Sequence, residues 1–307
     1  MRFEELSLRI PGDELRMRFH QRVTVLSGLE APERRGLVES LLGSLRLEPV
    51  GPDGYRAPNA EAGHFIFGGQ LLAQSVFAGL AGTEEKRVKT VHTVFARSGS
   101  TDSPVEIAVD RMHAGRAFAS STVTISQGER LCARSQVLLT ADEPDFIRHS
   151  DPAPDVKAPP DGSVAGGIGP WEVAVVGDVD VSDPDQIGPP DLDVWTRFVG
   201  APDDPAVDQA LLAYATDGFL IGTHMRPHAG VGQSQSHVTL STGVISHTIT
   251  FHEPAPASAW LLLSHHSTYA GHGRCYGTAN VYRSDGALVA SYAQDGMIRP
   301  LEAGAKM

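Results

Sequence analysis

An aspartate within an apolar segment is the residue of this chain whose surroundings most favour chemistry. Asp217 follows the run LLAYAT and precedes GFLIG, in a stretch with helical spacing. A carboxylate among apolar neighbours is costly unless it reaches a cavity or a polar partner. Asp217 is therefore a candidate catalytic residue. The alternative is a solvated side chain near the end of the helix, where Gly218 follows.

A glutamine in an alternating, strand-like run is the second candidate. Gln294 lies in VASYAQDGMI, and its amide could donate one hydrogen bond and accept another, which suits holding a water molecule. The alternative is a core amide with a structural role only. Gln136 occupies the matching place in an internal repeat, so both alternatives stay open.

Two adjacent glycines begin another segment with helical spacing, FGGQLLAQSVFAGLAG (67–82). Backbone N–H groups are free at a helix start and can donate to a substrate oxygen. Gly68, Gly69 and the following Gln70 are therefore candidate substrate-binding residues. Paired glycines could equally serve the close packing of a helix on a strand.

The thirteen histidines raise the question of a metal site. His265 and His266 are adjacent, and His247 and His252 differ by five, so the members of each pair point to opposite faces of a strand. No HExxH motif and no Cys/His ligand pair occurs in the sequence. We expect no metal and no other cofactor.

These candidates depend on a frame that the chain builds twice. Residues 115–136 recur at 273–294 with the same spacing and without a gap. The identical pairs are Gly115/Gly273, Arg116/Arg274, Val123/Val281, Ser126/Ser284, Gly128/Gly286 and Gln136/Gln294. Ordinary residue frequencies give about one or two identities in such a window, so the repeat indicates one folding unit used twice.

Each unit combines one apolar helix with several strands. In the first unit (41–140), the helix at 67–82 precedes strand-like runs at 88–96, 105–112, 118–126 and 130–140. In the second unit (193–300), a strand at 193–200 and a helix at 206–221, begun by Asp203-Asp204-Pro205, precede four more runs. A sheet curled around an apolar helix, doubled so that the two sheets merge and lose an exposed edge, is an α+β fold called the double hotdog.

Three segments remain. Residues 1–40 are an N-terminal extension, with a predicted hairpin around Gly12-Asp13 and a helix near Glu33–Leu45. Residues 47–66, rich in Pro and Gly, predict a loop. Residues 141–192, rich in Pro and Asp, predict a linker with a short strand at 171–176.

Composition excludes several classes of function. The chain has 307 residues, of which 41% are hydrophobic and 20% charged, and a net charge of −12. This acidic balance argues against binding to nucleic acid or to an anionic membrane. The apolar runs are too short to span a bilayer, and the first residues lack the layout of a signal peptide. With two cysteines only, we expect a reducing, cytoplasmic location.

The order of the motifs resembles the acyl-CoA thioesterase II family. The motifs are FGGQLLAQS (67–75), VHTVF (91–95), HAGRAFAS (113–120), VWTRF (194–198), LLAYATD (211–217), SHTITFHEP (246–254) and LVASYAQDGMIRP (288–300). Together they cover about residues 40–300. The resemblance implies hydrolysis of acyl-CoA thioesters to a free acid and coenzyme A, a reaction of fatty acid metabolism.

In that family an aspartate, a serine or threonine, and a glutamine of the second unit hold the attacking water. The resemblance assigns Asp217 as the aspartate and Gln294 as the glutamine. Counted back from His247, the hydroxyl position holds Val244, which cannot hydrogen-bond water.

A neighbouring hydroxyl could replace the missing one. Side chains alternate along a strand, so Thr242 and Ser246 are expected on the same face as Val244. Either residue is a candidate catalytic residue, and a bulge near Gly243 could also bring a neighbour into place. The departure at Val244 leaves a second function open, a non-catalytic acyl-CoA or lipid-binding protein. A homo-oligomer would cover exposed sheet edges and helical faces.

Overall fold

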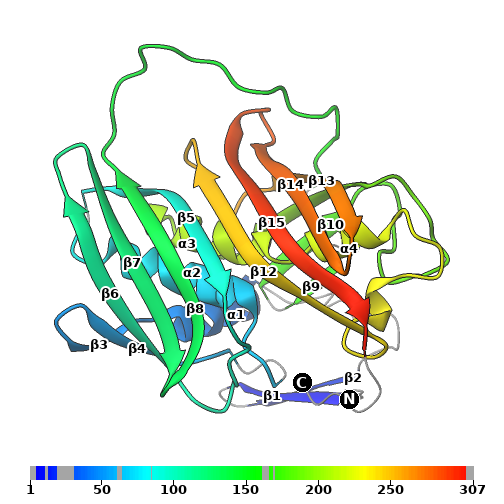
Figure 1. The fold of residues 1–307 in the computed structure, drawn as a ribbon, viewed down its shortest axis with the longest axis horizontal. Coiled ribbons are helices and arrows are strands. Elements are labelled where there is room, and N and C mark those ends of the chain that lie inside the picture. Colours follow the sequence, from blue (N-terminus) through cyan, green and yellow to red (C-terminus); the bar gives the residue numbers. More distant parts are fainter. Residues whose placement is uncertain are drawn as a thin grey trace.

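One antiparallel sheet is the frame of the protein (Figure 1). The computed structural model describes residues 5–10, 13–18, 31–60, 64–83, 85–160, 166–168 and 170–301. Within these residues, 13 strands pair in the order β3-β4-β6-β7-β8-β5-β12-β15-β14-β13-β11-β10-β9. Their bounds are β3 (Glu48–Gly51), β4 (Gly54–Ala57), β5 (Arg87–Phe95), β6 (Val105–Ala114), β7 (Phe118–Gln127), β8 (Arg130–Thr140), β9 (Gly166–Ile168), β10 (Trp171–Val175), β11 (Asp191–Phe198), β12 (Leu240–Phe251), β13 (Leu261–Gly271), β14 (Arg274–Arg283) and β15 (Leu288–Pro300).

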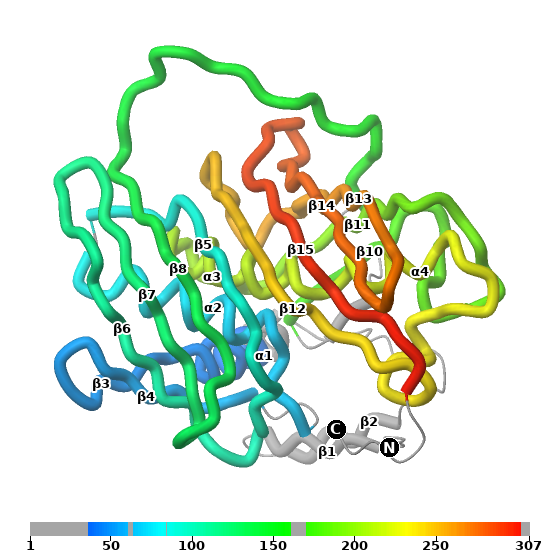
Figure 2. Tube along the Cα trace, in the orientation of Figure 1, coloured from blue at the N-terminus to red at the C-terminus, as the bar shows by residue number. Residues whose placement is uncertain are grey.

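Two helices lie together inside the curve of this sheet, α2 (Gly68–Leu80) and α3 (Pro205–Thr216) (Figures 1 and 2). The helix α2 is apolar on nearly every side, and 11 of its 13 residues are buried. That surface suits a helix that strands cover on several sides. The curled sheet around a central helix in each unit, predicted from the sequence, is confirmed. In the second unit the buried α4 (Leu220–Met225) packs on β13 and β14, with a 3-10 turn (Gln233–Gln235) beside it, while α1 (Ala31–Leu45) lies beside α2.

The start of α3 follows its sequence signal. Asp204 adopts an extended backbone and its carboxylate accepts hydrogen bonds from the N–H groups of Ala206 and Val207, while Pro205 takes the first helical position. This is a strong N-terminal cap.

The end of α3 differs from the prediction of one helix over 206–221. The helix stops after Thr216, and α4 begins at Leu220. Gly218 lies in the break, where a Cβ atom would come within 2.8 Å of the Trp171 ring. The tight turn against this ring separates the two helices and leaves Asp217 at a helix end.

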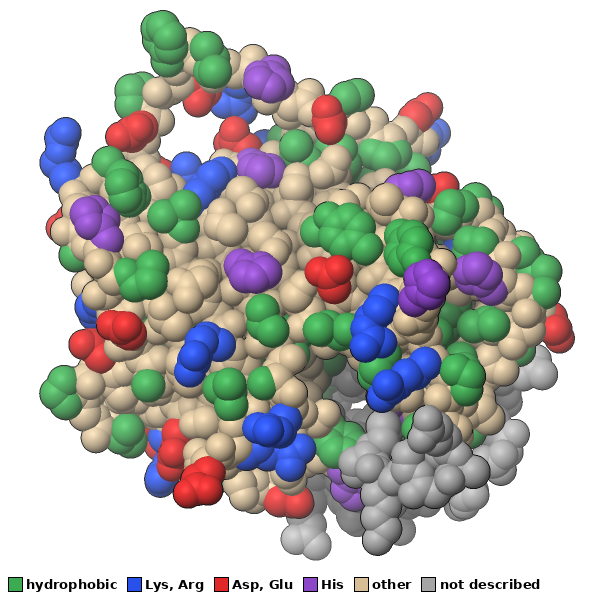
Figure 3. All heavy atoms as spheres, viewed as in Figure 1, with side chains coloured by type: hydrophobic (Ala, Val, Ile, Leu, Met, Phe, Trp, Pro, Cys, Tyr) green, Lys and Arg blue, Asp and Glu red, His purple; other side chains and the backbone are tan. Residues whose placement is uncertain are grey.

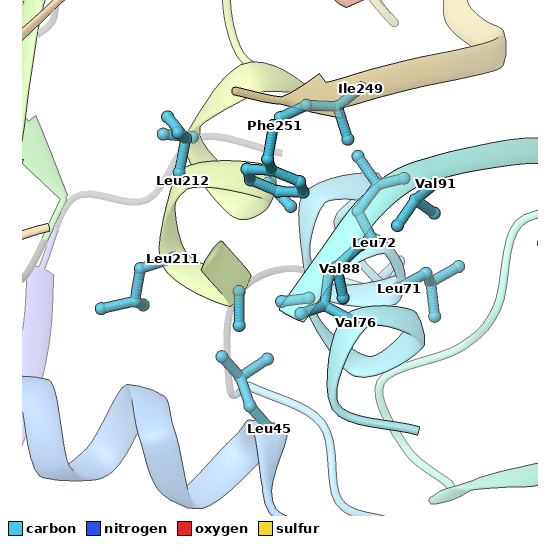
Figure 4. Close-up of a cluster of buried hydrophobic side chains, with 14 of the residues drawn as sticks. Leu45, Leu71, Leu72, Val76, Val88, Val91, Leu211, Leu212, Ile249 and Phe251 are labelled. Carbon is cyan, nitrogen blue, oxygen red and sulfur yellow. The ribbon is translucent and has the colours of Figure 1, made fainter. Parts of the chain in front are cut away.

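The two units join through the pair β5 and β12, which run antiparallel from Ser246 opposite Val94 to Thr250 opposite Thr90. The join turns two sheets into one, as expected, and leaves neither of these strands as an edge. The core is shared as well. Figure 4 shows Leu71 and Leu72 of α2 near Val91 of β5 and Ile249 of β12, all within one cluster of buried side chains.

The linker between the units is partly packed. Beyond β8 the chain arches away from the body, and Phe146 in this arch is 99% exposed. In Figure 3 an opening separates the arch from the rest of the molecule. It then returns, and Ala153, Val156 and Ala158 pack on the outer side of the second unit against Trp195, Trp260, Leu262 and Tyr282. Acidic and basic side chains are interspersed on the face in Figure 3.

Of the remaining secondary-structure predictions, three are confirmed and one is wrong. The N-terminal hairpin is confirmed as β1 (Glu5–Ile10) paired with β2 (Asp13–Arg18), and α1 and β10 confirm a helix and a short strand. The stretch predicted as a loop at 47–66 instead contains β3 and β4, which add a hairpin to the sheet edge beside β6. Within the described residues, no helix has both the length and the apolar character needed to cross a membrane.

Substitution of two glycines tests how closely α2 packs on the sheet. A Cβ atom at Gly79 of α2 would lie 2.6 Å from Val137 Cγ1, whereas a Cβ atom at Gly36 of α1 meets nothing within 4 Å. We expect Gly79→Ala to lower the free energy of unfolding by ~1–3 kcal/mol through overpacking. Gly36→Ala should raise it by ~0.5–1 kcal/mol through helix propensity. Urea unfolding followed by tryptophan fluorescence measures both, and a neutral Gly79→Ala would contradict the packing described.

Candidate active site

The carboxylate of Asp217 lies where the end of α3 meets the beginning of α2. A Cβ atom at Gly68 would come within 2.5 Å of Asp217 Oδ2, and one at Gly69 within 2.3 Å of the Tyr214 carbonyl oxygen. The backbone N–H of Gly69 donates to the Asp217 carboxylate. Both glycines therefore allow close packing, against the end of α3 rather than against a strand, and the Gly69 N–H donates to the protein's own carboxylate. Donation to a substrate oxygen stays a prediction.

Burial makes Asp217 an unusually weak acid. The residue as a whole is only partly buried, yet its Oδ1 is enclosed and has no hydrogen-bond partner among the described residues. Loss of solvation raises the pKa of the carboxyl to about 7, against the opposing effect of the Gly69 N–H. A carboxylate with a pKa near neutral is well matched to taking a proton from water.

Aromatic side chains cluster near this helix end. Trp171 contacts Phe67, Tyr214 and Phe219, with ring centroids 6.5, 5.8 and 5.6 Å away. These residues come from β10, from α3 and from the segments beside α2 and α4, so both units contribute. Burial, together with the charge of Asp217, also raises the pKa of Tyr214 to about 12.

Gln294 is brought to the same helix end. Its side chain is buried on the inner face of β15, and its Nε2 donates to the backbone oxygen of Thr216, 3.0 Å away. Thr216 immediately precedes Asp217 in the chain. The other end of the amide, Oε1, is buried without a partner among the described residues. Within the described part of the chain, Asp217 and Gln294 thus each present one acceptor without a partner.

The predicted orientation of Ser246 is wrong. The pairing of β12 with β15 shifts between Val244, opposite Gly296, and Ser246, opposite Asp295. Ile245 is therefore the extra residue of a bulge, which turns Ser246 to the outer face, and Ser246 Oγ donates to Asp295 Oδ2 at 2.7 Å. The bulge lies two residues beyond the predicted place, and it removes Ser246 from Gln294.

Thr242 keeps the predicted face but lies far along the strand. It is buried and pairs with Ile298, four residues beyond Gln294 in β15. Four residues of strand span about 13 Å, which is too far for one water molecule to bridge. Neither predicted hydroxyl is therefore placed beside Gln294.

The two glutamines of the repeat are not equivalent in space. Gln136 is exposed and its Nε2 donates to Thr122 Oγ1 at 3.0 Å, whereas Gln294 faces the helices. The hairpins that carry these glutamines close in different registers. In the first unit, β7 and β8 place Gln127 opposite Arg130, whereas in the second unit β14 and β15 place Tyr282 opposite Leu288. An odd shift in register turns a side chain to the other face of a strand.

Gln70 has a structural position in the first unit. Its Oε1 accepts from the Ala60 N–H at 3.0 Å and its Nε2 donates to Asn59 Oδ1 at 2.8 Å. Both ends of the amide therefore hold the loop before α2. Among the described residues, no group of three or more His, Cys, Asp or Glu side chains could hold a metal ion.

Two residues of the site were not predicted to belong to it, although Thr216 lies in the motif LLAYATD and His247 in SHTITFHEP. Thr216 Oγ1 lies 2.9 Å from His247 Nε2, and both side chains are buried. His247 stands directly opposite Gln294 across the strand pair. Burial lowers the pKa of His247 to about 3, so its imidazole is neutral at physiological pH.

The fold and the paired acid and amide define a double hotdog protein with a candidate hydrolytic site. Two family profiles match the chain, the acyl-CoA thioesterase N-terminal domain at residues 56–140 and the acyl-CoA thioesterase C-terminal domain at residues 148–298. The chain belongs to the acyl-CoA thioesterase II family.

Individual relatives cover nearly the whole chain. Acyl-coenzyme A thioesterase 8 of Mus musculus is 26% identical over 285 residues, covering 83% of this chain and 87% of the relative. Acyl-CoA thioesterase 2 of Haemophilus influenzae is 27% identical over 291 residues, covering 86% and 98%. The crystal structure of the acyl-CoA thioesterase II TesB2 of Mycobacterium marinum has a TM-score of 0.70 at 25% identity, covering 87% of this chain and all of that one.

The raised pKa of Asp217 has a consequence for stability. A carboxyl with a pKa of about 7 in the folded protein and 3.8 as its ordinary value opposes folding as pH rises from about 4 to 7. We expect Asp217→Asn to raise the free energy of unfolding by roughly 2–4 kcal/mol at pH 8, and by less at pH 5.

Urea unfolding at the two pH values measures this difference. The control is Asp295→Asn, which removes an exposed carboxylate of β15, next to Gln294 in the chain. It should change stability little at either pH. Equal effects of Asp217→Asn at pH 5 and pH 8 would show that Asp217 ionises as an ordinary carboxyl.

Proposed function

We propose that this protein hydrolyses acyl-CoA thioesters to a free acid and coenzyme A, with Asp217 as general base and Gln294 as the group that orients the water. The observation that supports this most is the enclosed carboxylate of Asp217, one oxygen of which has no hydrogen-bond partner among the described residues. The preceding residue, Thr216, accepts a hydrogen bond from the Gln294 amide through its backbone oxygen. Membership of the acyl-CoA thioesterase family gives the substrate class.

The two unpaired acceptors suit a single water molecule. Water has two protons to donate, one to Asp217 Oδ1 and one to Gln294 Oε1, which leaves an oxygen lone pair for attack on the thioester carbonyl. Asp217 takes the proton as the C–O bond forms. Cleavage of the C–S bond then releases the coenzyme A thiolate, which recovers that proton and leaves Asp217 ionised.

The start of α2 is the proposed site of carbonyl polarisation. The Gly69 N–H already donates to Asp217, and the Gln70 N–H donates to the Phe67 oxygen at 3.0 Å. Gly68, beside the carboxylate, is therefore the residue of this segment that we assign to the developing oxyanion.

The acid and the amide can be tested by substitution. We expect Asp217→Asn to lower kcat/KM at least ~100-fold and Gln294→Ala to lower it ~10- to 100-fold, since each removes a contact to the attacking water. Release of free thiol from acyl-CoA substrates of several chain lengths measures the rates. Gln136→Ala is the matched control, because this exposed glutamine of the repeat should leave the rate within twofold.

Several outcomes of that experiment are decisive. A folded wild-type protein that binds acyl-CoA tightly but releases no thiol would favour the non-catalytic binding protein, to which Val244 in the hydroxyl slot also points. Wild-type rates in Asp217→Asn would remove the proposed base.

The pH dependence follows from the same carboxyl. Since the base must be ionised, kcat/KM should rise with pH through the Asp217 pKa of about 7 and level off above it. At pH 6 the rate should be roughly tenfold below the plateau. Initial rates between pH 5 and pH 9 measure the profile, with unfolding checked at each pH. A plateau that already begins at pH 5 would contradict a base with this pKa.

Three broader features of the function belong to the same proposal. A role in fatty acid metabolism follows from the substrate class. A cytoplasmic location is favoured by the two cysteines, Cys132 and Cys275, which are both buried and free. Assembly of two or more copies remains a prediction from the sheet edges.

A further inference from the structure

A buried polar row crosses the middle of the sheet beneath the two central helices. Its members are directly opposite one another on four adjacent strands: Gln294 on β15, His247 on β12, Thr93 on β5 and Ser135 on β8. All four side chains are at most 1% exposed. Polar groups in such surroundings need partners, and each half of the row takes its partners from a different helix.

In the first unit the row ends on α2. Thr93 Oγ1 lies 2.8 Å from Ser135 Oγ, which lies 2.9 Å from Ser75 Oγ, and Ser75 Oγ donates to the Leu71 oxygen. This chain of hydroxyls joins β5 and β8 to the middle of α2, away from Asp217. It satisfies the buried groups without reaching the candidate site.

In the second unit the row ends on the last turn of α3. Thr216 Oγ1 donates to the Ala213 oxygen at 2.8 Å, and this uses the only proton of the hydroxyl. The neutral His247 must then donate its Nε2–H to Thr216 Oγ1, 2.9 Å away. The Gln294 amide donates to the Thr216 carbonyl oxygen. Three hydrogen bonds thus fix one residue, which is the neighbour of Asp217.

We infer that Thr216 and His247 are positioning residues for the hydrolysis, which hold the end of α3 so that Asp217 and Gln294 face the same water molecule. The inference rests on the proposed function. Without the Thr216 hydroxyl, the helix end loses its link to β12, and the carboxylate and the amide no longer share a fixed frame. Small misplacements of catalytic groups have large kinetic costs.

The experiment compares two identical substitutions on the same polar row. Thr216→Val and Thr93→Val each replace a fully buried hydroxyl by a methyl group of similar size, one at the site and one in the first unit. We expect Thr216→Val to lower kcat ~10- to 100-fold with KM within twofold of wild type, and Thr93→Val to keep kcat within twofold. Thr216→Ser retains the hydroxyl and should restore kcat to within threefold.

A second variant breaks the same link from the strand. His247→Asn shortens the side chain so that it no longer reaches Thr216, and it should reproduce the loss of kcat if Thr216→Val fails to fold. Thermal unfolding of every variant separates lost activity from lost protein.

The inference fails if Thr93→Val lowers kcat as much as Thr216→Val, or if Thr216→Ser is as slow as Thr216→Val. It also fails if His247→Asn and Thr216→Val keep wild-type kcat. A wild-type protein that releases no thiol would instead overturn the proposed function, so the two failures are distinct.

Discussion

The enclosure of one carboxylate between two helix ends is the constraint on which the rest of the site depends. Asp217 lies where α3 stops, and the start of α2 comes so close that no side chain fits at Gly68 or Gly69. The two units that supply these helices share one sheet through β5 and β12. The site is therefore a product of the doubled fold, with the base from one unit and the facing helix from the other.

The doubling of the fold does not double the site. Both units have the curled sheet, the central helix and a glutamine in matching sequence, yet Gln136 is on the outer face and Gln294 on the inner face. Where the second unit has an amide and an imidazole on its inner face, the first has the hydroxyls of Thr93 and Ser135. A gapless repeat thus gives two different interiors, because one hairpin closes in a register shifted by an odd number of residues.

Much of this arrangement could be predicted from the sequence. Apolar periodicity located both central helices and most strands, and the Asp204-Pro205 signal located the start of α3. The placement of Asp217 in an apolar segment indicated a carboxylate in need of a cavity or partner, and its buried Oδ1 agrees with that argument.

The failures share a physical cause, since each depends on a feature that alternation along a strand or helix does not encode. The bulge at Ile245 reversed the face of Ser246, and α3 ends at Thr216, before Gly218, where a side chain would meet the Trp171 ring. Thr216 and His247 lie within the motifs LLAYATD and SHTITFHEP, but only their meeting across helix and strand gives them a role.

The central claim is that burial keeps the Asp217 carboxyl protonated to near-neutral pH. Infrared difference spectroscopy during a pH titration observes the carboxyl stretch directly, and Asp217→Asn identifies the band. We expect a protonated carboxyl band that disappears with a midpoint near pH 7 and is absent from the variant. A band that disappears near pH 4, as for an exposed aspartate, would show that burial does not raise the pKa of Asp217.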